Sequence, residues 1–236
     1  MDNCKEESLL CDFHIHTNYS DGSLNLRKVV DIYGQTGHDI IAITDHLVDK
    51  TNLMGMAAHT INASLSEENF EEYLENIVYE SKRALDKYDM LVMPGVEITK
   101  NHISAAKSAH ILLIDIKKYI PPELSYKKLF LEAKKQNALI IAAHPYHVLG
   151  LDKETLYLWN NRKYFSKYID AWEIGCNKDL FNVVSLESYP FVANSDFHKT
   201  SHIHSWRTLL YCKKEIECVK KCIKDNTKVA IKFFRK

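Results

Sequence analysis

Nine side chains with the chemistry of metal ligands recur along this chain of 236 residues. Six are histidines, three are carboxylates, and no cysteine belongs to the set. Imidazole and carboxylate ligands without thiolate favour zinc, manganese or iron over calcium or magnesium. In chain order the nine are His14, His16, Asp21, His46, Glu97, His110, His144, Asp196 and His198.

A set of this size is large enough for more than one metal ion. A tetrahedral site uses about four ligands, so nine candidates suffice for two or three divalent ions if some ligands are shared and water fills the open positions. Ions roughly 3.5–4 Å apart can clamp the attacking and leaving oxygens of an ester, and they acidify a bridging water. The set therefore indicates metal-dependent hydrolysis, most naturally of a phosphoester.

Most of these residues stand where a short apolar run ends. Such runs, bounded by polar residues, are typical of buried strands. Groups at the carboxyl ends of parallel strands meet at one rim of an α/β sheet or barrel, even when they are far apart in sequence. His110 differs because it opens an apolar run, so its preceding loop is expected to carry it back over the rim. The runs that end at candidate ligands are 11–13, 39–44, 90–96, 138–143 and 190–195.

Helical patterns alternate with these runs, which favours a mainly parallel sheet, plausibly closed as a barrel. We expect one domain over residues 1–236, with Ser23 as the N-cap of its first helix. Helices are expected over 24–35, 67–88, 126–136 and 215–224, and further strands over 110–114, 169–174, 208–212 and 228–233.

Composition narrows the functional classes. The net charge is zero, which does not indicate attraction to nucleic acid or anionic lipid. No apolar stretch is long enough to cross a bilayer, and residues 1–10 do not resemble a secretory signal. The six cysteines include no Cys-x-x-Cys pair. A cytoplasmic enzyme with reduced thiols is therefore expected.

The ordered motifs resemble those of the PHP (polymerase and histidinol phosphatase) family. The resemblance covers residues 11–212, and a C-terminal helix and strand occupy 213–236. Each motif alone is a weak signal, whereas the ordered set is specific. The motifs are DFHIHT at 12–17 with SDG at 20–22, ITDH at 43–46, PGVE at 94–97, AHP at 143–145 and SDFH at 195–198.

The resemblance implies an α/β fold, a distorted seven-stranded (β/α) barrel with a trinuclear site at its carboxyl-end rim. Glu97 would bridge two metals and, with Asp196, is the catalytic candidate. Asp45 would orient an imidazole, as carboxylates near metal sites commonly do. One metal would be held by His14, His16, Glu97 and Asp196, a second by Glu97, His110 and His144, and a third by Asp21, His46 and His198.

Candidate substrate contacts follow the last motif. His202 is expected to contact a phosphate or to donate a proton to the leaving group. Arg207 is expected either to grip a phosphate with its guanidinium fork or to form a salt bridge on the barrel surface. Two insertions, 47–67 and 100–109, are expected to project from the rim and to select or cover the substrate.

The leading hypothesis is a phosphoesterase in which a metal-bridging hydroxide attacks a small phosphomonoester or phosphodiester. One alternative is a metal-dependent hydrolase of a non-phosphate ester, amide or carbamate. Another is a non-catalytic metal-binding PHP module, which the filled ligand positions disfavour. No groove of basic and aromatic residues indicates a nucleic-acid polymer, although a nucleotide or short oligonucleotide fits the hypothesis. Substrate, metal identity and oligomeric state stay open.

Overall fold

The computed structural model describes residues 8–51, 64–146 and 155–235. Most of the insertion expected over 47–67 lies outside the described residues. The strands are β1 (Leu9–Asp12), β2 (Ile40–Ile43), β3 (His46–Val48), β4 (Leu91–Lys100), β5 (Ala109–Ile114), β6 (Leu139–Ala143), β7 (Ala171–Cys176), β8 (Asp179–Leu180), β9 (Phe191–Asn194), β10 (Trp206–Leu210) and β11 (Val229–Phe233).

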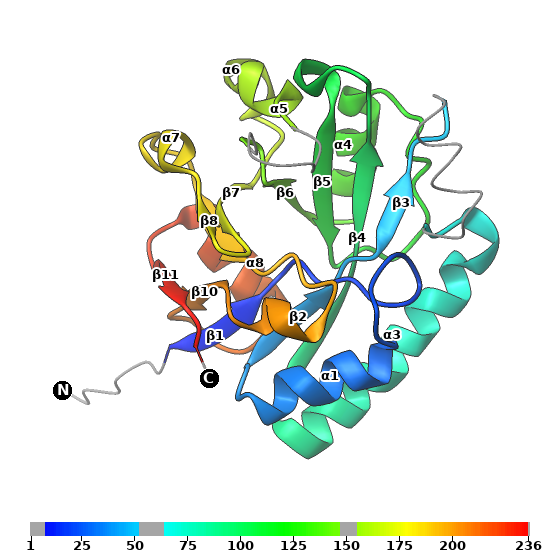
Figure 1. The fold of residues 1–236 in the computed structure, drawn as a ribbon, viewed down its shortest axis with the longest axis vertical. Coiled ribbons are helices and arrows are strands. Elements are labelled where there is room, and N and C mark those ends of the chain that lie inside the picture. Colours follow the sequence, from blue (N-terminus) through cyan, green and yellow to red (C-terminus); the bar gives the residue numbers. More distant parts are fainter. Residues whose placement is uncertain (1–7, 52–63, 147–154, 236) are drawn as a thin grey trace.

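Helices connect and cover these strands (Figure 1). The α-helices are α1 (Leu26–Gln35), α3 (Glu67–Tyr88), α4 (Tyr126–Lys135), α5 (Tyr157–Asn160), α6 (Arg162–Phe165), α7 (Asn182–Ser185) and α8 (Ile216–Asp225), and short 3-10 helices occupy η1 (Ala105–Lys107) and η2 (Thr200–Ile203).

The strands form one strongly curved sheet with the order β11-β10-β1-β2-β4-β5-β6-β7-β8, in which β3 also pairs with β4 and β9 with β7. A parallel bridge between Ile15 and Phe197, just past β1 and β9, links the two sides of the curve. The expected mixed α/β fold with a curled sheet is confirmed. The expected count of seven strands is not, because the short β3 and β8 and the pair β10–β11 extend the sheet.

Strand direction departs from the expected pattern at β5. Strands β1, β2 and β4 pair in parallel, as do β6, β7 and β9. Strand β5 runs antiparallel to both β4 and β6. Its first residues therefore lie at the same end of the sheet as the last residues of its neighbours, and His110 pairs with Ala143.

The four longer helices, α1, α3, α4 and α8, form where amphipathic periodicity predicts them, whereas the short α5, α6 and α7 were not predicted. Helix α3 has the predicted bounds, buries Phe70, Tyr73 and Ile77, and packs beside α1 (Figure 1). Helix α1 begins at Leu26, and the Asn25 side chain accepts a hydrogen bond from Lys28 N. Ser23 is therefore not its N-cap. None of the described helices is both long and apolar enough to span a membrane.

Alternation along the strands creates two apolar clusters. In β2, Ile40 and Ala42 belong to one cluster, and Ile41 and Ile43 belong to the other. The first cluster lies on the inner face of the sheet and includes Val219 from α8. Helices α1, α3 and α4 cover the second. The sheet is thus packed on both faces, which fixes the directions of its strand ends.

Helix α8 covers the end of the curved sheet where β1 begins. Lys220 Nζ lies 2.7 Å from Asp115 Oδ2 and donates to Asn137 O at 2.9 Å. Asp115 directly follows β5, and Asn137 lies two residues before β6 begins. His110 and Ala143 lie at the opposite end of the curved sheet.

A buried polar network holds Arg207, contrary to the phosphate contact expected from the sequence. Arg207 is fully buried and lies 3.3 Å from Asp12 Oδ2, and its Nε donates to His38 Nε2 at 2.9 Å. Tyr33 OH donates to the same carboxylate oxygen of Asp12 at 2.7 Å. The other oxygen of Asp12 accepts from Ser195 N at 3.1 Å. The structure therefore makes Arg207 the counter-charge of a buried carboxylate that joins β1 to β9.

Arg207→Ala should destabilise the fold without acting through substrate affinity. The substitution leaves Asp12 buried and unpaired, which costs about 3–5 kcal/mol of unfolding free energy. Urea unfolding measures this loss, and Arg207→Lys should recover only part of it because an ammonium lacks the guanidinium geometry. An Arg207→Ala protein with normal stability and a raised KM would restore the original expectation.

Candidate metal centre

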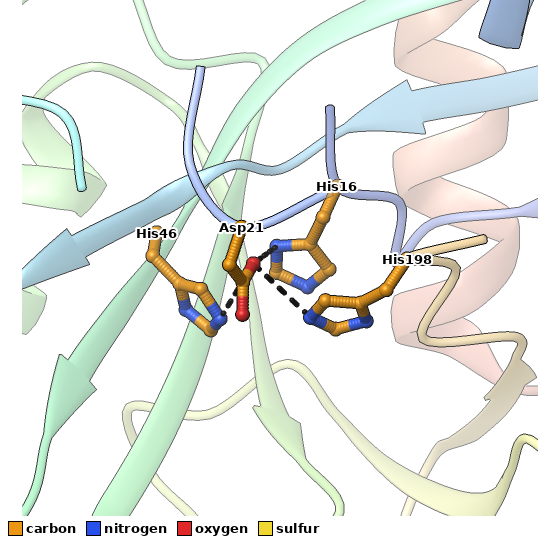
Figure 2. A group of neighbouring side chains, drawn as sticks. All are labelled: His16, Asp21, His46 and His198. Carbon is orange, nitrogen blue, oxygen red and sulfur yellow. Dashed lines mark ion pairs between the residues drawn. The ribbon is translucent and has the colours of Figure 1, made fainter. Parts of the chain in front are cut away.

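Four side chains from distant parts of the chain surround one point at the rim of the sheet (Figure 2). Asp21 Oδ1 lies 3.9 Å from His16 Nδ1, 3.5 Å from His46 Nε2 and 3.2 Å from His198 Nε2. His16 follows β1, His46 opens β3 and His198 follows β9. Their ligand atoms lie within 4.8 Å of one another, which makes this group a candidate site for one cation.

Glu97 lies at the centre of a second set. It sits inside β4 and is fully buried. Its two oxygens face different groups of histidines, as a carboxylate shared between two cations would. Oε1 lies 2.9 Å from His110 Nδ1 and 3.3 Å from both His14 Nε2 and His144 Nε2, whereas Oε2 lies 2.8 Å from His46 Nδ1 and 3.5 Å from His16 Nε2.

Asp196 completes the cluster from the end of β9. Its Oδ1 lies 3.3 Å from His14 Nε2, 3.2 Å from His16 Nε2 and 3.5 Å from His198 Nδ1. The structure thus brings all nine candidate ligands together. Further groups whose ligand atoms approach within 4.8 Å are His14, His16 and Glu97; His14, His144 and Asp196; and Glu97, His110 and His144.

The donor set fits divalent transition metals. Within the described residues, the buried Nε2 of His14 and both ring nitrogens of His16 make no hydrogen bond. A buried polar atom without a partner carries a desolvation cost that a ligand can remove. Imidazole nitrogens and carboxylate oxygens at this spacing suit zinc, manganese or iron.

The cluster keeps its carboxylates ionised. Burial raises the pKa of Glu97, but the charges of His14, His110 and His46 outweigh it and hold the pKa well below the usual range. Burial of His16, together with the charges of His198 and His46, lowers its pKa to about 3. His16 is therefore neutral at physiological pH, the state that a metal ligand requires.

Two candidate ligands occupy left-handed backbone. The φ angle is 51° at Asp196 and 25° at His144, a region that non-glycine residues seldom adopt. At His144 the surroundings hold this conformation, because its N donates to Glu173 Oε2 and its O accepts from Thr155 Oγ1, both at 2.6 Å. Such strain concentrates at functional sites, where it aims side chains that a regular strand end would not.

Glu173 is a functional candidate that the sequence did not single out. It is fully buried in β7, and its Oε1 lies 3.1 Å from His14 Nδ1. Asn194 Nδ2 donates to the same oxygen at 2.7 Å. A carboxylate on Nδ1 fixes the ring so that Nε2 presents a lone pair to a metal. The only sequence signal is an acidic residue in the middle of an apolar strand.

Further polar groups contact ring nitrogens of three histidines. His46 Nδ1 lies 2.8 Å from Thr99 Oγ1, and His144 Nδ1 lies 3.2 Å from Thr155 Oγ1. Asn101, from the insertion 100–109, places its Oδ1 3.0 Å from His110 Nε2. That insertion therefore contributes to the centre itself.

Asp45 acts differently from the expected orientation of an imidazole. Its carboxylate accepts from Thr17 N at 2.7 Å, from Thr17 Oγ1 at 2.8 Å and from Ser20 Oγ at 2.6 Å. No hydrogen bond between Asp45 and a histidine ring occurs among the described residues. Asp45 instead fixes the turn that carries Asp21, because hydrogen bonds from both Thr17 and Ser20 hold that turn in one conformation.

A cavity of about 730 Å³ opens over the cluster, which is the size of a small-molecule site. His202 lines it, and its Nδ1 lies 3.1 Å from Asp196 O. Burial, with the nearby charges of His198 and Lys199, lowers the pKa of His202. The structure thus brings His202 to the site, whereas Arg207 does not reach the cavity.

Glu173→Gln should weaken metal binding. The change keeps the shape but removes the charge that orients His14, and such partners are typically worth about 10–100-fold in metal affinity. Competition with a chromophoric chelator measures the effect, and Glu132→Gln on exposed α4 is the matched control. Equal affinities for the two variants would remove Glu173 from the centre.

Metal affinity should rise with pH between 7 and 9. Burial lowers the pKa of His198, but its hydrogen bond to Asp21 and the charges of Asp196 and Asp21 raise it to about 9. In metal-free protein this imidazole is protonated at pH 7, so binding must displace a proton. Affinity should therefore gain about tenfold per pH unit for each proton displaced. Calorimetry in buffers of different ionisation enthalpy counts these protons, and a count of zero contradicts the assignment.

The structure resembles one solved structure over nearly its whole length. That structure, a two-domain protein from Bacteroides vulgatus that contains a predicted PHP-like metal-dependent phosphoesterase, matches with a TM-score of 0.69 at 21% identity. The match covers 96% of this chain but 65% of that protein, so this chain spans about two thirds of its length. At this identity the likeness shows the fold.

Two further structures match less closely. A proposed metal-dependent phosphoesterase from Bifidobacterium adolescentis has a TM-score of 0.48 at 15% identity, and an amidohydrolase from Chromobacterium violaceum has 0.49 at 14%. Each match covers 80% of this chain and 87% of the other. No curated protein sequence shows a significant match. The family model of the PHP domain matches residues 12–171. This interval reaches from β1 into β7 and contains seven of the nine candidate ligands.

That interval contains His14, His16, Asp21, His46, Glu97, His110 and His144, while Asp196 and His198 follow it. Because the match covers more than half of the chain, this protein belongs to the PHP domain family.

Proposed function

We propose that this protein is a metal-dependent phosphoesterase that acts on a small phosphomonoester or phosphodiester. The observation that carries the proposal is the sharing of Glu97 among histidines on both of its oxygens, within a cluster that opens to a cavity. This arrangement supports two or three divalent ions held close together, with zinc, manganese or iron as the ions that the donors suit.

The distances support three ligand groups. We assign Asp21, His46 and His198 to one ion, with His16 near enough to join them. Glu97, His110 and His144 would hold a second ion. His14, His16, Glu97 and Asp196 would hold a third, so that Glu97 serves two ions.

Bound ions would acidify a water molecule and place positive charge beside the phosphoryl oxygens. Side chains of the protein would position the ions and the leaving group. Glu97 and Asp196 would fix the spacing of the ions, and Glu173 would orient His14. His202 would stand beside the leaving group, because its Nδ1 is anchored to the Asp196 carbonyl and its Nε2 makes no hydrogen bond to the described residues. In its imidazolium form this ring would donate its Nε2 proton to the departing oxygen and keep its Nδ1 proton on the Asp196 carbonyl.

A second candidate function is the hydrolysis of a non-phosphate ester or amide, because activated water is not intrinsically selective for phosphorus. The charge of the side chains that line the cavity favours one of the two candidate functions. Lys178 and Lys199 line it beside the cluster, and cationic groups favour a charged phosphoester over a neutral ester or amide. A panel of phosphomonoesters, phosphodiesters and neutral esters, tested with metal-loaded protein, distinguishes them. Turnover restricted to neutral esters would replace the phosphoesterase proposal.

Glu97→Gln should abolish most turnover. An amide cannot supply two anionic oxygens to two ions, so we expect kcat to fall on the order of 10²–10³-fold while KM changes little. Steady-state kinetics on the best phosphoester measures this, and circular dichroism checks the fold. The shared role of Glu97 is wrong if kcat stays within a few fold of wild type.

A further inference from the structure

The cavity over the centre has a second wall that the hydrolysis of a phosphoester does not itself require. This wall consists of the turn after β7 and the segment after His198. All of its side chains are polar or charged. They are Asn177, Lys178, Asp179, Lys199 and Ser201.

No Phe, Tyr or Trp side chain lines the cavity. The chain has 9 Phe, 13 Tyr and 3 Trp, and residues 1–7, 52–63, 147–154 and 236, which lie outside the described part, include none of them. Every such ring therefore belongs to the described part of the chain. Nucleobases and phenyl groups are commonly bound by stacking on these rings. The cavity offers no such surface to an aromatic leaving group.

The two lysines of the wall stand on well-defined backbone. Lys178 lies in the two-residue turn between the paired residues Cys176 and Asp179. Asn177, its neighbour in that turn, donates to Asn194 O at 3.1 Å and accepts from Trp206 N at 3.0 Å. Lys199 opens η2 and accepts from His202 N at 2.8 Å. Both lysines are exposed, and neither forms an ion pair within the described residues.

We infer that the substrate is a small non-aromatic phosphoester with a second anionic group, and that Lys178 and Lys199 bind this group. The inference rests on the proposed phosphoesterase function. The phosphoester lies at the cluster, and the second anion, a carboxylate or another phosphate, reaches the two lysines of the second wall. Asp179 opposes this attraction, so its removal should strengthen binding of the second anion.

Matched substrates test the inference. 3-Phosphoglycerate differs from glycerol 3-phosphate by a carboxylate in place of a neutral group, and fructose 1,6-bisphosphate adds a phosphate to fructose 6-phosphate. For wild type, in at least one of the two pairs, kcat/KM should be about tenfold higher for the compound with the second anionic group. This is the order expected of two partly exposed ion pairs. The pair that shows the larger difference in kcat/KM identifies the second anionic group as a carboxylate or a phosphate. AMP and phenyl phosphate should be poorer substrates than either 3-phosphoglycerate or fructose 1,6-bisphosphate.

Variants test whether the two lysines cause the preference for a second anionic group. Lys178→Ala and Lys199→Ala should each reduce it about threefold, and the double variant should abolish it. Asp179→Asn should increase it. Lys128→Ala, an exposed lysine on α4 away from the cavity, removes the same charge and should leave the preference unchanged. Raising the salt from roughly 0.1 M to 1 M should weaken the wild-type preference.

Binding without turnover provides an independent readout. Calorimetry should show that 3-phosphonopropionate binds metal-loaded protein more tightly than propylphosphonate does, and that the double lysine variant removes the difference. If no phosphoester is hydrolysed, the proposed function fails. If phosphoesters are hydrolysed but wild type shows no preference for a second anion, prefers AMP or phenyl phosphate, or keeps its preference in the double variant, the inference alone is overturned.

Discussion

The rest of the structure depends on the charge of one buried carboxylate. Glu97 lies in the middle of β4 with no exposed surface, and an ionised group in such a place is stable only if opposite charges compensate it. Five histidines from four other segments approach its two oxygens. In metal-free protein, protonated imidazoles provide part of that compensation, and they hold the pKa of Glu97 well below its usual range. The same geometry would hold cations in their place.

The fold brings these side chains together because packing contacts occupy one end of the sheet and the candidate ligands occupy the other. Helix α8 covers one end of the curved sheet, and the Lys220–Asp115 contact fixes it there. At the other end the strands stop, and their last side chains turn towards one another. Between the two ends, Asp12 joins the backbone after β9 to Arg207 and Tyr33, directly beneath His14. The centre is therefore built on buried strands, which hold its geometry more firmly than loops alone could.

Much of the site could be predicted from the sequence because strand ends converge by topology. Apolar runs that stop at polar residues revealed His14, His144 and Asp196 as neighbours without any knowledge of side-chain contacts. His110 did not fit that pattern. The reason is strand direction: β5 runs antiparallel, so its first residues lie where the others finish. A single apolar run carries no signal for its direction.

Residues whose roles depend on three-dimensional partners were harder to predict. Glu173 and Asn101 act through particular imidazole nitrogens, and nothing in their local sequence indicates those partners. Arg207 was expected either to grip a phosphate or to form a salt bridge on the surface, yet it is fully buried against Asp12. Ser23 resembled a helix cap, but its backbone N and its Oγ both donate to the His198 carbonyl at 2.8 Å, which ties the Asp21 turn to the last motif. Local patterns predict elements well, whereas contacts across the curved sheet depend on how distant strands come together.

The central claim is that the nine clustered side chains form a multinuclear metal centre. Anomalous diffraction from crystals of metal-loaded protein, recorded on both sides of the absorption edge of the metal, tests it most directly. The account predicts two or three peaks per chain, including one beside Asp21, His46 and His198 and one beside Glu97, His110 and His144. The absence of any peak within bonding distance of Glu97, in crystals grown with saturating metal, would contradict it.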